Sequence, residues 1–142
     1  VCWRSIAENP SFGGAGTEGI TAALPDPPAP PPPGTPGPMA FADRDYLATI
    51  LTDAGWDKVA VDPFDTVFDH SVDGSDGVEE RLTLILATTT GRLAREQLDN
   101  TITTEKWSDV VERTREQIQT YVVDGSVKLP GALWLVTASS QH

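Results

Sequence analysis

The sequence predicts an α/β fold, and three observations predict it. Residues 132–138 (ALWLVTA) form an almost unbroken apolar run, which is typical of a central strand covered on both faces. Residues 56–69 alternate apolar and polar positions around Pro63, which has no N–H for a ladder and so favours an edge strand or a bulge. Residues 78–89, and those from a cap at Thr103 or Thr104 to about Val123, have the apolar period of helices.

Composition limits the class of protein. The chain has 142 residues, 39% of them hydrophobic, which suffices for one domain with a modest core. A formal net charge of -11 argues against nucleic-acid or anionic-membrane partners, because phosphates require clustered Lys and Arg. Cys2 is the only cysteine, and neither a signal peptide nor a membrane span is evident. We therefore expect a soluble, cytoplasmic protein.

The N-terminal segments predict a strand end and a long loop. Residues 1–12 begin inside an apolar patch at Val1, so we interpret 1–3 as the end of a longer strand. Residues 13–40 form a Gly/Pro-rich loop. Gly14, Gly16 and Gly19 have the spacing of a dinucleotide-binding turn. Such a turn must lie between a strand and a long helix, so we expect a flexible loop rather than a phosphate site.

Residues 25–38 hold nine of the twelve prolines, all except Pro10, Pro63 and Pro130. A segment of this kind adopts an extended or polyproline II path. Two interpretations remain open: a ligand for a proline-recognising domain, and a stiff surface connection packed over the fold. We favour the second.

The remaining segments follow in order. Residues 41–69 contain a helix capped by Asp43 and stopped by Gly55, followed by the edge strand. The acidic loop 73–77 lacks the distal Glu of a calcium-binding loop, so we expect a solvated turn. Residues 77–124 carry the helices, including a short one within 91–100. After a turn at 124–125, residues 127–138 form the final strand.

Three stretches in this order resemble the C-terminal half of class I S-adenosylmethionine-dependent methyltransferases. They are VCWR with ENP (residues 1–4 and 8–10), FAD with AGW (41–43 and 54–56), and LPGALWLVTA (129–138). The resemblance is greatest to the small-molecule branch that includes ubiquinone and menaquinone biosynthesis enzymes. It covers nearly the whole chain, and its strength lies in the order rather than in one motif.

The resemblance implies a Rossmann-like sheet that ends in strands five, seven and six, with strand seven antiparallel between the other two. Residues 1–3 would end strand five, 57–69 would form strand six, and 132–138 would form strand seven. The helices between 78 and 123 would be an insertion that contributes to a substrate cover. Residues 1–142 would then be the C-terminal portion of one methyltransferase domain.

The same resemblance implies S-adenosylmethionine as cofactor, but the family's cofactor motifs belong to the half that precedes strand five. We therefore assign no cofactor-binding residue and no metal ligand. Ligands bind beyond the carboxyl ends of parallel strands, which makes Trp3, Arg4, Asn9 and Phe12 candidates for contacting a small-molecule methyl acceptor. The alternative is that Trp3 packs under the proline loop and Arg4 forms a surface ion pair.

No catalytic residue is assigned. Methyl transfer depends on alignment of the acceptor and exclusion of water, and neither His70 nor His142 has an identifiable partner. We expect a partial methyltransferase that is inactive as these 142 residues alone. The alternatives are a non-enzymatic α/β binding or interaction module and a non-catalytic methyltransferase-like subunit.

Overall fold

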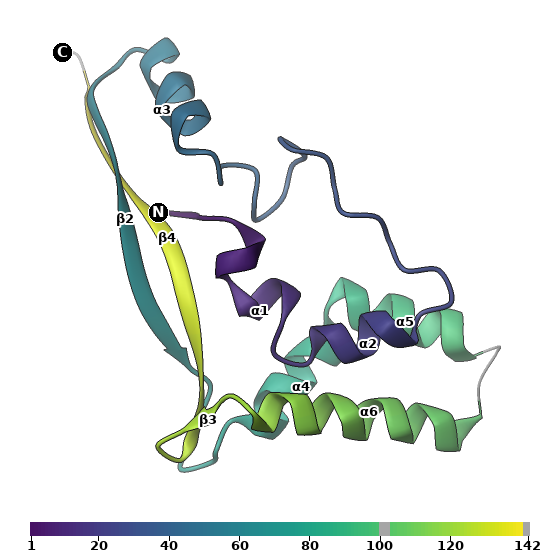
Figure 1. Ribbon diagram of the computed structural model, residues 1–142. Coiled ribbons are helices and arrows are strands. Elements are labelled where there is room, and N and C mark those ends of the chain that lie inside the picture. Colours follow the sequence, from purple (N-terminus) through teal and green to yellow (C-terminus); the bar gives the residue numbers. More distant parts are fainter. Residues whose placement is uncertain (100–102, 141–142) are drawn as a thin grey trace. The chain divides into compact units, whose positions relative to one another are not determined.

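The computed structural model describes residues 1–99 and 103–140 and has a mixed α/β architecture (Figure 1). Its elements are β1 (Cys2–Trp3), a 3₁₀ helix (Ile6–Glu8), α1 (Pro10–Gly13), α2 (Thr17–Ala23), α3 (Arg44–Asp53), β2 (Trp56–Asp69), α4 (Val78–Ala87), α5 (Thr89–Asp99), α6 (Thr104–Gln119), β3 (Val122–Val123) and β4 (Ser126–Ser140). The chain divides into two compact units. Unit 1 is Val1–Pro10, Pro30–Thr66 and Pro130–His142, and unit 2 is Ser11–Ala29 and Val67–Leu129.

The described strands form an open antiparallel sheet in the order β1-β4-β2, with β3 paired to β4. Cys2 lies opposite Trp134 and Trp3 lies opposite Leu133 in the β1–β4 register. The predicted central position of the apolar run is therefore confirmed, because β4 has a neighbour on each side. The predicted edge position of the Pro63-bearing strand is also confirmed, since β2 ends this path.

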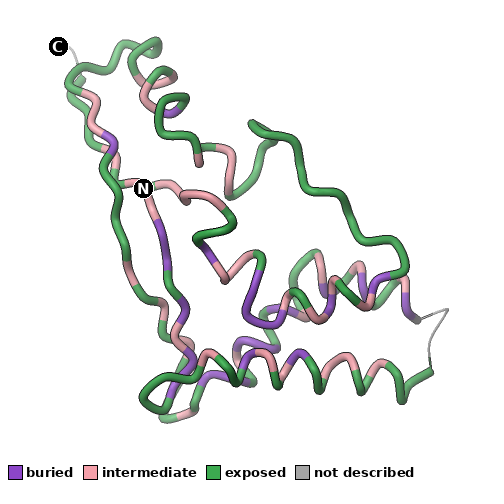
Figure 2. The backbone as a smooth tube through the Cα atoms, in the orientation of Figure 1, coloured by how far each residue is buried: buried purple, intermediate pink, exposed green. Residues whose placement is uncertain are grey.

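The main hydrophobic core belongs to unit 2. Its helices turn their apolar faces toward one another, as Figure 2 shows by the buried positions along α2, α4 and α6. The buried members of this core are Ala15, Ile20, Leu24, Val78, Leu82, Ile85, Ala94, Leu98, Ile118, Val127 and Leu129. The predicted apolar faces of α4 and α6 are thus confirmed.

Helix ends follow capping chemistry. The Asp43 carboxylate accepts a hydrogen bond from the Tyr46 N–H at 2.8 Å, and the predicted cap of α3 is confirmed. Thr103 caps α6, but the predicted continuation of this helix to Val123 is wrong. Residues 122–123 instead form β3, which pairs with β4 through the turn at 124–125, where both φ angles are positive. Such a turn favours a hairpin over another helical turn.

The prediction of one continuous loop over residues 13–40 is wrong in part. Thr17–Ala23 forms α2, because Ile20 on this helix is fully buried in the core of unit 2. Residues 25–38 have no helix or strand, as predicted, but every one of them is exposed. The Asp26 backbone exchanges two hydrogen bonds with the Gln97 side chain of α5, at 3.3 and 3.1 Å, so the expected packing of this proline segment over the fold is found in part, at its start.

The prediction that residues 132–138 are covered on both faces is also wrong. Leu135 is 43% exposed, and Leu133, Trp134 and Val136 are only half-buried. Unit 1 has few buried apolar residues among those described, namely Leu47, Val61 and Ala132. Its large exposed apolar side chains are Val1, Ile6, Phe41, Tyr46, Trp56, Phe64 and Leu135. The sheet of unit 1 therefore carries uncovered apolar surface.

Candidate functional site

The best-defined polar cluster of unit 1 surrounds Arg4, directly after β1. The Arg4 guanidinium donates to the Glu8 carboxylate at 3.0 Å and lies 2.8 Å from the Asp65 carboxylate of β2. It also lies over the Trp134 ring of β4, 5.6 Å from the ring centroid. Its side chain is only 12% exposed. Segments that are distant in sequence thus meet at one guanidinium.

The charges of this cluster reinforce one another. Burial disfavours the charged form of Arg4, but the hydrogen bond to Glu8 and the charge of Asp65 outweigh it, and the pKa of Arg4 is raised. The pKa of Glu8 is lowered, first by the hydrogen bond from the Ser5 hydroxyl and then by Arg4. Arg4 therefore forms the ion pair that the alternative interpretation predicts, and its charge is matched by two carboxylates.

Asn9 has a structural role. Its side chain is 0% exposed, and its Oδ1 accepts a hydrogen bond from the Ala132 N–H at 2.8 Å. Its Nδ2 donates to the Ala132 carbonyl at 3.0 Å and to the Ser5 carbonyl at 2.9 Å. The Arg4 N–H donates to the same Ala132 carbonyl at 3.0 Å. Arg4 and Asn9 thus jointly attach the segment after β1 to β4.

The four predicted contact residues are divided between the two units. Trp3, Arg4 and Asn9 belong to unit 1, whereas Phe12 in α1 belongs to unit 2. Trp3 and Phe12 are half-buried. Sequence reasoning missed Asp65 and Trp134 as partners of Arg4, because no local pattern indicates which β2 and β4 side chains lie beside β1.

The Gly-rich turn of unit 2 packs around a buried arginine. Arg81 of α4 is 5% exposed and donates to the carbonyls of Ser11, Gly14 and Ala15 at 2.9, 3.4 and 3.4 Å. Burial lowers the pKa of Arg81. A phosphate-binding turn presents converging N–H groups, whereas this turn presents carbonyl oxygens to a cation. The glycines therefore fit packing and do not fit a cofactor phosphate.

Of the two histidines, His70 lies within the residues that the structure describes. Its Nε2 is buried and has no hydrogen-bond partner among residues 1–99 and 103–140. Burial, and then the charge of Arg81, lower its pKa, which favours the neutral imidazole. The other histidine, His142, lies outside the described residues. Within those residues, no three His, Cys, Asp or Glu side chains group in a way that could hold a metal ion.

Comparison of the sequence with protein-family models, curated proteins and solved structures gives no match. None of the helices in the described part of the chain combines the length and apolar character needed to cross a lipid bilayer.

Proposed function

We propose that the chain is the C-terminal portion of an S-adenosylmethionine-dependent methyltransferase that acts on a small molecule. The observation that carries this proposal is the sheet order β1-β4-β2, with β4 antiparallel to β1. It supports the proposal because the resembled family ends its sheet in strands five, seven and six, with strand seven antiparallel. In this proposal β1, β4 and β2 correspond to those three strands.

The surface of unit 1 gives a second line of support. Its strands expose large apolar side chains such as Phe64 and Leu135, and few of its apolar residues are buried. Burying an apolar side chain contributes about 1.5–3 kcal/mol, so a self-sufficient sheet would normally cover such positions. If another segment completes the sheet, that segment would cover these apolar side chains.

The proposal gives the described residues acceptor-side roles only. In this proposal β1 would run parallel to the other parallel strands of the family's sheet. Trp3 and Arg4 lie at the carboxyl end of β1, and ligands of such sheets bind at that end. Asn9 and the ion pairs of Arg4 would hold this segment against β4, while Trp3 would contact the acceptor. The Gly-rich turn does not fit the cofactor, so its binding strands would be supplied from outside these 142 residues.

Calorimetry with S-adenosylmethionine tests the proposal. It compares residues 1–142 with the chain extended by whatever its reading frame encodes before Val1. We expect no binding by residues 1–142 and saturable binding by the extended chain. Tight binding by residues 1–142 alone, or an extension without a strand, glycine-rich turn and helix, would contradict the proposal.

A second candidate function is a non-enzymatic interaction module, which the full exposure of residues 25–38 favours. Such a module would be monomeric, unfold cooperatively and bind little hydrophobic dye. The methyltransferase portion would bind the dye or self-associate through the uncovered surface of unit 1. Dye titration together with light scattering on residues 1–142 therefore separates the two candidates.

A further inference from the structure

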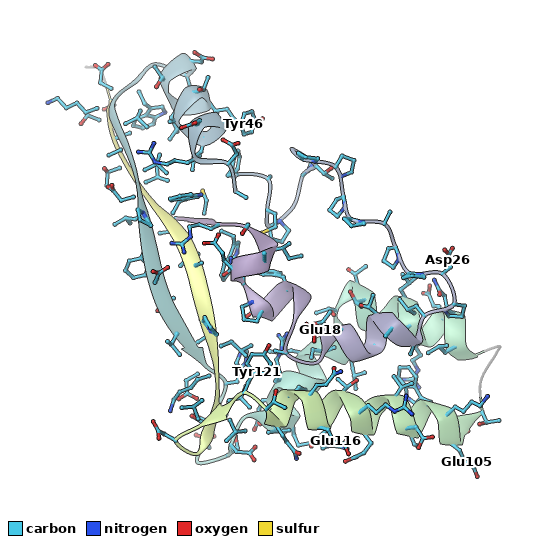
Figure 3. The ribbon with its side chains drawn as sticks, in the orientation of Figure 1. Glu18, Asp26, Tyr46, Glu105, Glu116 and Tyr121 are labelled. Atoms are coloured by element: carbon cyan, nitrogen blue, oxygen red, sulfur yellow. The ribbon has the colours of Figure 1, made fainter. Side chains whose placement is uncertain are left out.

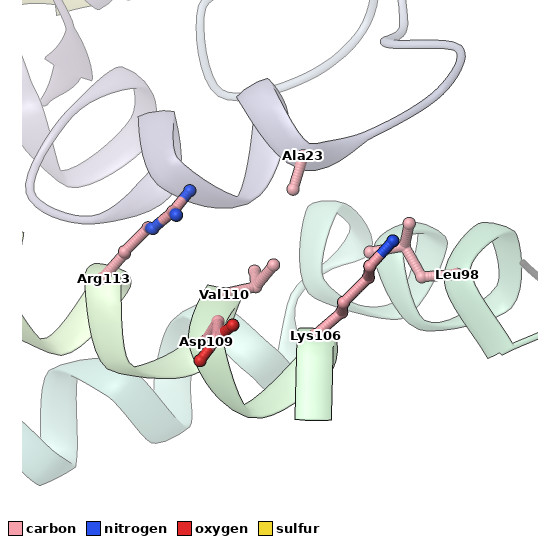
Figure 4. Close-up of a pocket in the computed structure, with 6 residues that line it drawn as sticks. All are labelled: Ala23, Leu98, Lys106, Asp109, Val110 and Arg113. Carbon is pink, nitrogen blue, oxygen red and sulfur yellow. The ribbon is translucent and has the colours of Figure 1, made fainter. Parts of the chain in front are cut away.

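A pocket lies inside unit 2, where α2, α5 and α6 meet (Figure 4). Its volume is about 310 Å³, and its lining residues are Ala23, Leu98, Lys106, Asp109, Val110 and Arg113. This size is near the lower limit of small-molecule sites, which occupy roughly 300–1,000 Å³. The pocket is therefore large enough for a short-chain ligand.

The pocket has an apolar base. Leu98 belongs to the buried core, and Ala23 and Val110 pack against that core. These three side chains come from three different helices, so the base is fixed by the packing of unit 2 itself. An apolar ligand chain would cover surface that the helices leave open.

The rim of the pocket is cationic. Lys106 and Arg113 lie seven residues apart on α6, which places them on the same side of the helix. In Figure 4 the Arg113 side chain extends toward α2 and the Lys106 side chain extends toward Leu98 of α5, with the Asp109 carboxylate beside α6 between them. Two other acidic residues of this helix, Glu105 and Glu116, project from the side opposite α2 (Figure 3).

These two cations have no carboxylate partner in the described part of the chain. Arg115, by contrast, pairs with Glu79 and Glu112. The two cations outnumber the single carboxylate of the lining, Asp109, so the lining side chains carry a net formal charge of +1. The C-terminal ends of α2 and α5 add only partial negative charge. Unpaired cations above an apolar base are complementary to an amphipathic anion.

We propose that this pocket binds a small amphipathic carboxylate, with its alkyl chain on Ala23, Leu98 and Val110 and its carboxylate between Lys106 and Arg113. The inference uses unit 2 alone and does not depend on methyl transfer. Failure to bind S-adenosylmethionine would leave it unaffected.

Calorimetric titration of residues 1–142 with octanoate, and with octanol as the uncharged counterpart, tests the proposal. We expect saturable octanoate binding that is tighter than octanol binding. Replacing both cations (Lys106→Gln with Arg113→Gln) is expected to weaken octanoate binding about fivefold and to leave octanol unchanged. Arg92→Gln, a matched change of an exposed α5 cation that does not line the pocket, is expected to change neither affinity.

Val110→Trp is expected to abolish binding of both ligands because the indole fills the pocket. Ala23→Leu fills it from α2 and replaces this variant if Val110→Trp unfolds, as judged by circular dichroism. Any of four results overturns the proposal. Two concern the unmodified chain: no saturable octanoate binding, or equal affinity for octanol. The other two are octanoate binding that survives in a folded pocket-filling variant and unchanged octanoate binding in the double variant.

Discussion

Gly16→Ala tests whether the Gly-rich turn serves packing. Gly16 has φ = 99°, and a Cβ at this position would lie 2.8 Å from Ile118 Cγ1, 3.0 Å from Ile85 Cδ1 and 3.1 Å from Thr114 Cγ2. These three side chains are buried, so they have little room to move aside. The added methyl group would therefore both strain the backbone and overfill the core.

The two costs are of similar size. A non-glycine residue in left-handed conformation costs about 1–2 kcal/mol. Overpacking a core costs about 1–3 kcal/mol. We expect Gly16→Ala to lower the free energy of unfolding by about 2–5 kcal/mol, a large share of the 5–15 kcal/mol that is typical of a domain.

Gly19→Ala is the matched control. Its Cβ would lie 2.7 Å from Gln117 Oε1, which is the end of a flexible side chain. The lost hydrogen bond from the Gly19 N–H to this oxygen is offset by the better helix propensity of alanine, about 1 kcal/mol. We therefore expect a change near zero.

Urea unfolding followed by far-ultraviolet circular dichroism measures both variants. With a slope of about 2 kcal/mol per molar urea, Gly16→Ala lowers the midpoint by about 1–2.5 M. A midpoint equal to that of the unmodified chain, or an equal loss in both variants, would refute the packing role of Gly16.

Three further predictions concern buried polar groups. Asn9→Ala leaves the Ala132 N–H without its partner, so we expect a loss of about 1–3 kcal/mol and faster amide exchange at Ala132; unchanged exchange would contradict the structural role of Asn9. Arg81→Met removes three hydrogen bonds to the Gly-rich turn and should cost about 1–3 kcal/mol by urea unfolding, whereas equal stability would show that relief of the buried charge compensates fully. The folded-state pKa of His70 is lowered, so the unfolded chain binds its proton more readily. The stability contribution of neutral His70 is complete above about pH 6.5 and is lost as pH falls through the folded-state pKa. His70→Phe should flatten this part of the profile of urea midpoint against pH, and an unaltered profile would assign the pH dependence to other groups.

Local patterns predicted the elements of the chain well wherever short-range chemistry decides them. Asp43 and Thr103 cap helices because their side-chain oxygens accept backbone N–H groups three residues on. The apolar period of residues 78–87 produced α4 with Val78, Leu82 and Ile85 buried. The central position of residues 132–138 and the edge position of the Pro63-bearing strand were also predictable.

The candidate site was predictable only in part. The sequence identified Arg4 as a polar residue at the end of a strand, and the ion pair was one of its two interpretations. The partners Asp65 and Trp134 come from strands far along the chain, and their register with Arg4 has no local signal. The pocket of unit 2 was not predictable from local patterns either, because only helix packing brings Ala23, Leu98 and Val110 together.

The sequence by itself determined most of the helices and strands, although not α2 and β3, since capping, apolar period and proline placement act over a few residues. Only the tertiary structure decided which side chains are covered. Ile20, in a segment expected to be a loop, became fully buried because α5 and α6 pack against its helix, α2. Leu135, in the most apolar stretch, remained 43% exposed. Burial depends on what packs against a residue, and the neighbouring residues in the sequence do not identify that packing partner.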